Sequence, residues 1–241
     1  MNRRLFAALA LLASPAFAGP RVAIVLDDFG LTYKKNVPDE EWMAFDQPLT
    51  FAVMPESPRT KKAAKATLEA GKELIVHYPF DPFQKLVLAK DAAAPEDVVS
   101  AGKLLEKSLR DIPGAVGLNN HRSYRATRNR PLMREFMKLL KAKDIYFLDS
   151  KVSPRTVAYE EAQAAGVRAV MNYVFLDTAE IHTQAFCARN LAIVVAHARK
   201  HGEAVAVGHH YFRGTLDCLK EGMPRYAKEG IEFVKASALA R

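Results

Sequence analysis

The side chains best suited to chemistry in this sequence are carboxylates and imidazoles that follow short apolar runs. Each run has the length of a buried strand, and the polar residue comes at or near its carboxyl end. The set consists of Asp27 with Asp28, Glu56, His77, His121, Asp149, Asp177, and His209 with His210. Parallel α/β proteins place their chemistry at this end of the strands. The distribution therefore predicts that these side chains converge on one rim, and it favours an enzyme.

The adjacent acids Asp27 and Asp28 end the run VAIVLDDFG at 22–30. Neighbouring side chains of a strand point to opposite sides, so these two share one orientation only if the strand has ended. In one interpretation, one acid holds a metal and the other does proton work. In the alternative, both cap the following turn. This stretch alone does not decide between a site and a turn.

The other candidates also have structural explanations. His77 lies in an apolar strand and is explained equally well as a core histidine, and His121 follows two asparagines and suits a turn. Asp149–Ser150 and Asp177 suit helix caps, which is the interpretation we favour for Asp177. The remaining histidines lie on or near a predicted helix and are taken as surface residues: His182, His197 and His201.

One aspartate, two histidines and an open position form a recognised ligand set for a catalytic divalent ion such as Zn²⁺. The identity of the metal stays open on residue types alone. The two cysteines, Cys187 and Cys218, do not form a Cys-x-x-Cys motif, so a cysteine metal site is not expected. Whether they form a disulfide depends on geometry that the sequence does not contain.

Short strands alternate with helical segments, which predicts a parallel sheet built from β-α-β units. Seven or eight such repeats favour a distorted or incomplete (β/α)7–8 barrel. The expected strands lie within 22–30, 49–54, 73–78, 115–118, 145–148, 167–174, 203–207 and 231–235. The expected helices are 58–70 (stopped by Gly71), 95–110, 131–143, 153–165 (opened by Ser153-Pro154), 183–201 and 215–229, with a short helix or irregular insert at 38–45.

The first 18 residues read as a signal peptide. A basic segment and a short apolar run precede Ala16-Phe17-Ala18, a small-x-small cleavage motif, so we expect cleavage after Ala18 and a periplasmic or secreted protein. Residues 19–241 are expected to form a single domain without stable membrane insertion. Cleavage of the signal peptide would remove Arg3 and Arg4 and no acidic residue, so the formal net charge at pH 7 would fall from +8 by two. The basic residues are dispersed, and no nucleic-acid partner is expected.

Seven ordered motifs resemble the divergent polysaccharide deacetylase family, which is similar to carbohydrate esterases. They are Val-Leu-Asp-Asp-Phe-Gly (25–30), Phe-Ala-Val-Met-Pro (51–55), His-Tyr-Pro-Phe-Asp-Pro (77–82), Gly-Leu-Asn-Asn-His (117–121), Phe-Leu-Asp-Ser (147–150), Val-Phe-Leu-Asp (174–177) and Val-Gly-His (207–209). The resemblance implies a distorted barrel. It also implies Asp28, His77 and His121 as metal ligands, Asp27 as general base and His209 as general acid.

The sequence departs from the family pattern beside two of these motifs. Arg122-Ser123-Tyr124 follows His121 where the family usually has Met-Gly-Ser, and His210 stands where proline is usual. Arg122 and Tyr124 either bind an anionic sugar or partly fill the cleft. The residues expected to contact substrate are Asn120, Arg122, Tyr124, Asp149 and His210.

The leading functional hypothesis is an exported hydrolase that removes acetyl groups from an envelope or other polysaccharide, such as a peptidoglycan-type polymer. The hydrolase is expected to use a divalent metal ion, and Zn²⁺ is the ion we expect first. The metal would activate water, Asp27 would take its proton and His209 would protonate the leaving group. One alternative is a non-catalytic periplasmic glycan-binding or regulatory protein on the same barrel, because fold does not carry activity with it. Another is a different metal hydrolase, such as an amidase or phosphodiesterase.

Overall fold

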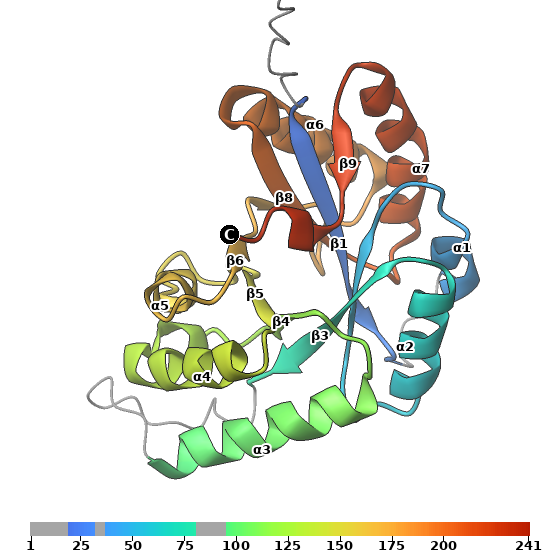
Figure 1. The fold of residues 1–241 in the computed structure, drawn as a ribbon. Coiled ribbons are helices and arrows are strands. Elements are labelled where there is room, and N and C mark those ends of the chain that lie inside the picture. The colour runs from blue at the N-terminus through green and yellow to red at the C-terminus, as the bar shows by residue number, and fades with distance from the viewer. Residues whose placement is uncertain (1–18, 32–36, 81–94) are drawn as a thin grey trace, which may run out of the picture.

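Strands and helices alternate along the part of the chain that the computed structural model describes, residues 19–31, 37–80 and 95–241 (Figure 1). The strands are β1 (Arg21–Phe29), β2 (Thr50–Val53), β3 (Glu73–Pro79), β4 (Gly117–His121), β5 (Tyr146–Asp149), β6 (Ala169–Met171), β7 (Val174–Phe175), β8 (Glu203–His209) and β9 (Glu232–Val234). The helices are α1 (Asp39–Met43), α2 (Thr60–Glu69), α3 (Pro95–Asp111), α4 (Arg130–Ala142), α5 (Ala158–Ala164), α6 (Gln184–His201), α7 (Arg213–Lys228) and the 3₁₀ turns η2 (Ala126–Arg128) and η3 (Ala236–Ala238). The predicted signal peptide and residues 81–82 of the third motif lie outside the described residues.

The strands form one curled parallel sheet in the order β6-β5-β4-β3-β2-β1-β8-β7, and β9 pairs with β1. β1 is the central strand: its first residues pair with β9, most of its length pairs with β8, and its end pairs with β2. The helices surround the outside of the sheet (Figure 1). The predicted incomplete barrel is confirmed.

The barrel is open between β6 and β7. The single strand expected at 167–174 is in fact two short strands, which lie at opposite ends of the sheet order. Between them, Asn172 N–H donates to the Asp149 carbonyl at 2.8 Å, and Tyr173 N–H donates to the Val205 carbonyl at 2.9 Å. The chain therefore crosses the opening between Asn172, which is bonded to β5, and Tyr173, which is bonded to β8. This crossing interrupts the predicted strand.

Both faces of the sheet are buried, so the strands read as continuous apolar runs rather than as alternating patterns. One face lines the barrel interior, and its apolar residues include Ala23, Val25, Ile75, Leu148, Val205 and Val207. The opposite face packs against the helices through residues such as Ile24, Leu26, Leu74 and Phe147. Alternate residues of each strand therefore point into the barrel or out toward the helices, and this alternation decides which polar residues reach the site.

Most predicted helices are confirmed, with one clear correction. Gly71 follows α2 with a φ of 67°, as expected of a residue that ends a helix. The helix expected to begin at Ser153-Pro154 instead begins at Ala158. Ser153 Oγ accepts a hydrogen bond from Arg155 N–H at 3.1 Å, so the serine forms a local turn before the helix rather than its N-cap. Among the described residues, no helix is long and apolar enough to span a membrane.

Cys187 of α6 and Cys218 of α7 form a disulfide, with Cα atoms 6.1 Å apart. Both residues are buried between their helices and the sheet. The bond answers the question that the sequence left open. It closes a loop across a sequence separation of 31 and ties together the two helices that flank β8 in the chain.

We predict that the double variant Cys187→Ala/Cys218→Ala unfolds at lower urea concentration than the wild type, with a loss of about 2–4 kcal/mol in free energy of unfolding. The unfolded chain gains conformational freedom when the cross-link is removed. Reduction of the wild type should produce a similar loss and leave the double variant unchanged. A double variant as stable as the oxidised wild type would show that the bond does not contribute.

Candidate active site

The end of β1 contains a bulge that brings two adjacent carboxylates to one side. Leu26 pairs with Phe51 and Phe29 pairs with Val53, so three steps along β1 match two along β2. Asp28 takes a left-handed backbone conformation with φ of 72°. One extra residue in a strand re-aims a side chain in this way. Asp27 and Asp28 therefore both line one pocket, through a bulge rather than through the end of the strand.

His210 holds this bulge from the outer face of the sheet. Its backbone N–H and its ring Nδ1 both lie within hydrogen-bond distance of the Asp27 carbonyl, at 3.3 and 3.1 Å. Its ring stacks on Phe29 at 4.5 Å. Burial lowers the pKa of His210 to about 4, so the ring is neutral and Nδ1 donates. The predicted substrate contact of His210 is therefore wrong: this side chain points away from the pocket and supports Asp27.

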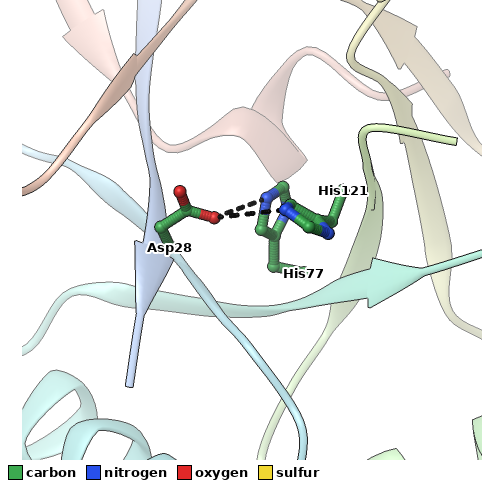
Figure 2. Close-up of side chains that lie close together, drawn as sticks. All are labelled: Asp28, His77 and His121. Carbon is green, nitrogen blue, oxygen red and sulfur yellow. Dashed lines mark ion pairs between the residues drawn. The ribbon is translucent and has the colours of Figure 1, made fainter. Parts of the chain in front are cut away.

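Asp28, His77 and His121 come together from β1, β3 and β4 (Figure 2). Asp28 Oδ1 lies 3.2 Å from His77 Nε2 and 4.0 Å from His121 Nε2. One ligand atom from each residue lies within 4.8 Å of the other two. A carboxylate with two imidazoles at this spacing is a donor set for a divalent ion such as Zn²⁺.

The surroundings of Asp28 agree with a cation site. Its Oδ1 atom is buried and accepts no hydrogen bond of ordinary geometry from the residues that the structure describes. Burial alone would raise the pKa of Asp28, but the contact with His77 and the positive charges of nearby histidines outweigh burial and lower it. The carboxylate is therefore ionised and available. These residues fit a bound divalent ion.

Asn119 orients His77, one of the three candidate ligands, and sequence reasoning missed it. The two residues are partners across β3 and β4, and His77 Nδ1 lies 2.8 Å from Asn119 Oδ1. Because that oxygen only accepts, Nδ1 carries the ring hydrogen and Nε2 faces Asp28. The Asn119 amide also donates to Asp27 Oδ1 at 2.8 Å and to Ser150 Oγ at 3.2 Å. The available signal was its position two residues before His121, on the same face of β4.

Asp27 lies beside the ligand cluster without belonging to it. Its Oδ2 atom is 3.6 Å from His77 Nε2, while its Oδ1 accepts the Asn119 hydrogen bond. Burial raises the pKa of Asp27, against the lowering influence of the charges on His77 and His209. A carboxylate with a raised pKa, fixed in orientation by an amide, is suited to exchange a proton with a neighbouring group.

His209 lies directly across from Asp27, as its register partner on β8. Its Nδ1 is 2.6 Å from Asp177 Oδ1, and its backbone N–H donates to Asp177 Oδ2 at 3.0 Å. Burial opposes the charged ring, but the hydrogen bond and negative charge of Asp177 raise the pKa of His209 to about 9. The helix-cap interpretation of Asp177 is therefore wrong. Thr183 caps α6, and Asp177 holds His209 protonated.

These residues share a pocket of about 310 Å³ at the carboxyl ends of the strands. Of the predicted substrate contacts, Asn120 and Arg122 line it. Asn120 is also structural, because its Oδ1 accepts from Ser150 N–H at 2.9 Å and its Nδ2 donates to the Arg122 carbonyl at 3.1 Å. Arg122 is exposed at the pocket wall. Glu56, after β2, pairs with Lys107 on the surface instead.

Two further predicted substrate contacts do not line the pocket. Asp149 faces the helices: its Oδ1 accepts from Lys151 N–H, and its Oδ2 accepts from Thr156 Oγ and from Tyr159 N–H in the first turn of α5. The alternative helix-cap interpretation fits it better. Tyr124 is 50% exposed and packs against the Arg128 guanidinium. The predicted substrate contact of Asp149 is therefore wrong, while that of Tyr124, which is exposed to solvent, stays a prediction.

Solved structures of other proteins share the architecture of this chain. An uncharacterized protein from Agrobacterium tumefaciens C58, ATU2773, superimposes with a TM-score of 0.79 at 22% identity, covering 95% of this chain and 92% of that one. A family 4 carbohydrate esterase from Streptomyces lividans, in complex with acetate, superimposes with a TM-score of 0.53 at 10% identity, covering 90% and 93%. At these identities the likeness shows the fold, a deacetylase-type α/β barrel.

Comparison of the sequence with known families identifies the family to which the chain belongs. A model of divergent polysaccharide deacetylases matches residues 24–240, so the chain belongs to that family. The uncharacterized protein YibQ of Escherichia coli K12 is 34% identical over 237 residues, which cover 97% of this chain and 71% of YibQ. The resemblance seen in the motifs is confirmed.

We predict that Asn119→Ala weakens Zn²⁺ binding about 10- to 100-fold, because a group that orients a metal-binding histidine contributes that much to affinity. His77→Gln should weaken binding further by removing a ligand. Titration calorimetry on purified protein measures both. The control is His197→Gln on α6, which makes the same change outside this pocket and should bind like wild type. Equal affinity of Asn119→Ala and wild type would contradict the orienting role.

Proposed function

We propose that this protein is a metal-dependent hydrolase that removes acetyl groups from a polysaccharide. The observation that carries the proposal is the joint position of three kinds of group in one pocket. A carboxylate–imidazole ligand set, the proton acceptor Asp27 and the protonated His209 all face the same space. Family membership supports this function over an amidase or phosphodiesterase.

Asp28, His77 and His121 would hold the metal, with Zn²⁺ the ion that best suits two imidazoles and one carboxylate. Such an ion polarises a carbonyl and lowers the pKa of water bound to it. The protein's own part is to keep the ligands ready: Asn119 fixes the His77 ring, and the β1 bulge aims Asp28.

Asp27 is the proposed general base. Its Oδ2 faces the ligand cluster, and its raised pKa gives it more affinity for a proton than an exposed aspartate has. Asn119 donates to the other oxygen and so fixes the direction of the reactive one. A site that only binds a glycan has no need of a carboxylate held beside the metal ligands, which is why we place the non-catalytic alternative second.

His209 is the proposed general acid. Asp177 fixes its Nδ1 hydrogen, so Nε2 is the nitrogen left to deliver a proton to the leaving amine or alkoxide. Thr215 Oγ donates to Asp177 at 2.6 Å and holds that carboxylate in place. Asp27 and His209, as partners on adjacent strands, supply the base and the acid on neighbouring parts of the pocket wall.

We further propose that the protein acts outside the cytoplasm. The pattern of residues 1–18 supports export. The disulfide between Cys187 and Cys218 adds independent support, because such bonds persist mainly in oxidising compartments.

Asp27→Asn should lower kcat for acetate release from an acetylated glycan about 10²- to 10⁴-fold, the usual contribution of general acid–base catalysis. Metal content should stay at the wild-type level, since Asp27 is not a proposed ligand. Asp217→Asn, on the surface of α7, is the matched control and should keep full turnover. Full activity of Asp27→Asn would exclude it as the base.

Asp177→Asn should shift the alkaline limb of the kcat/KM profile to lower pH. The acid form of His209 is required, and Asp177 keeps it protonated up to a pKa of about 9. Removing the carboxylate charge lowers that pKa toward the ordinary value of about 6.5. The pH–rate profiles of the wild type and of Asp177→Asn measure the shift. Identical alkaline limbs would rule out the proposal that His209 is the general acid and that Asp177 sets its pKa.

A further inference from the structure

Arg122 places a positive charge in the wall of the proposed active site. It follows the ligand His121 directly, lines the pocket and is exposed to solvent. Among the described residues, its guanidinium forms no salt bridge, unlike Arg130, which pairs with Glu160 and Glu161. Within the part of the chain that the structure describes, Arg122 is therefore a cation of the pocket wall without a salt-bridge partner.

The backbone that carries Arg122 is strained and firmly held. Arg122 and Ser123 are consecutive non-glycine residues with φ of 47° and 67°. Ser123 Oγ donates to the His121 carbonyl at 2.5 Å and accepts from Phe80 N–H at 3.1 Å. The Ser123 carbonyl accepts from Thr127 N–H at 3.0 Å. Strain of this kind persists where the surrounding structure over-determines it, and it concentrates at ligand sites.

The acidic side chains of the pocket have partners other than Arg122. Three buried carboxylates line the pocket: Asp27, Asp28 and Asp177. Asp27 and Asp28 contact His77, and Asp177 contacts His209 and Thr215. Among the described residues, none of the three forms a salt bridge with Arg122, which directly follows His121 in the chain. A guanidinium in this position favours a planar anionic group, which it binds through two parallel hydrogen bonds.

We propose that Arg122 selects an anionic saccharide, one that carries a carboxylate on or next to the acetylated sugar. The inference rests on the proposed deacetylase function and names the class of substrate for the same pocket. Neutral acetylated glycans would lack the group that Arg122 binds.

The test compares two glycans with the same backbone. One is a tetrasaccharide of alternating N-acetylglucosamine and N-acetylmuramic acid with free lactyl carboxylates, and the other is chitotetraose, which is neutral. Calorimetry with Zn²⁺-loaded Asp27→Asn protein gives both affinities. We expect the anionic glycan to bind about 10- to 100-fold more tightly, as hydrogen bonds to a charged group would give. Methyl esterification of its carboxylates should abolish the preference.

Arg122→Gln in the same background should remove the preference, and Arg122→Lys should restore part of it by returning the charge. The matched control is Arg128→Gln, which removes a charge from the same segment. Arg128 packs on Tyr124 and does not line the pocket, so its loss should leave the preference intact. Equal binding of the two glycans, no binding of either, or a preference that survives Arg122→Gln would overturn the proposal.

Acetate release by the wild type separates this proposal from the function on which it rests. Release from both glycans with equal kcat/KM would keep the deacetylase function and overturn the charge preference. Binding of the anionic glycan through Arg122, with no acetate released from either, would overturn the deacetylase function and keep the anionic site.

Discussion

The candidate site depends on the bulge at the end of β1. In a regular strand, Asp27 and Asp28 would point to opposite faces, and only one of them would reach the barrel interior. The extra residue turns both inward, so the candidate metal ligand Asp28 and the proposed base Asp27 are neighbours in the chain and line the same pocket. His210 secures this arrangement from behind, through two contacts with a single carbonyl oxygen. A buried neutral imidazole thus supports the backbone at Asp27.

One amide connects the ligands to the base. Asn119 accepts from His77 and donates to Asp27, so the orientation of a metal ligand and that of the proposed base are set by the same side chain. Asp177 orients His209 in the same way, and it is itself held by a hydrogen bond from Thr215. Each reactive group is therefore fixed by a buried polar partner, as a preorganised site requires. Changes within either network will not be additive, because their members share partners.

The sequence was enough to predict the barrel and to place Asp27, Asp28, His77, His121 and His209 at its carboxyl rim. It was not enough to separate inward from outward residues at that rim. Both faces of these strands are buried, so the apolar pattern carries no sign of which alternate positions face the interior. For this reason the sequence predicts pocket positions for Asp149 and His210, which lie on the outer face, and it gives no sign that Asn119 rather than Asn120 contacts His77 and Asp27. The bulge also has no signal in residue types.

The central position of β1 has a consequence for how the molecule forms. This strand comes first in the described chain, yet its partners include β8 and β9, and Asp27 is 183 residues from the histidine that clamps it. Contacts that span such a separation are slow to form, because a long loop must close before they contribute. The strand bearing both aspartates therefore stays incompletely paired until the last part of the chain is present. Because the pocket draws its lining from Asp27 through to Tyr211, it cannot be complete before β8 and the residues directly after it have been synthesised.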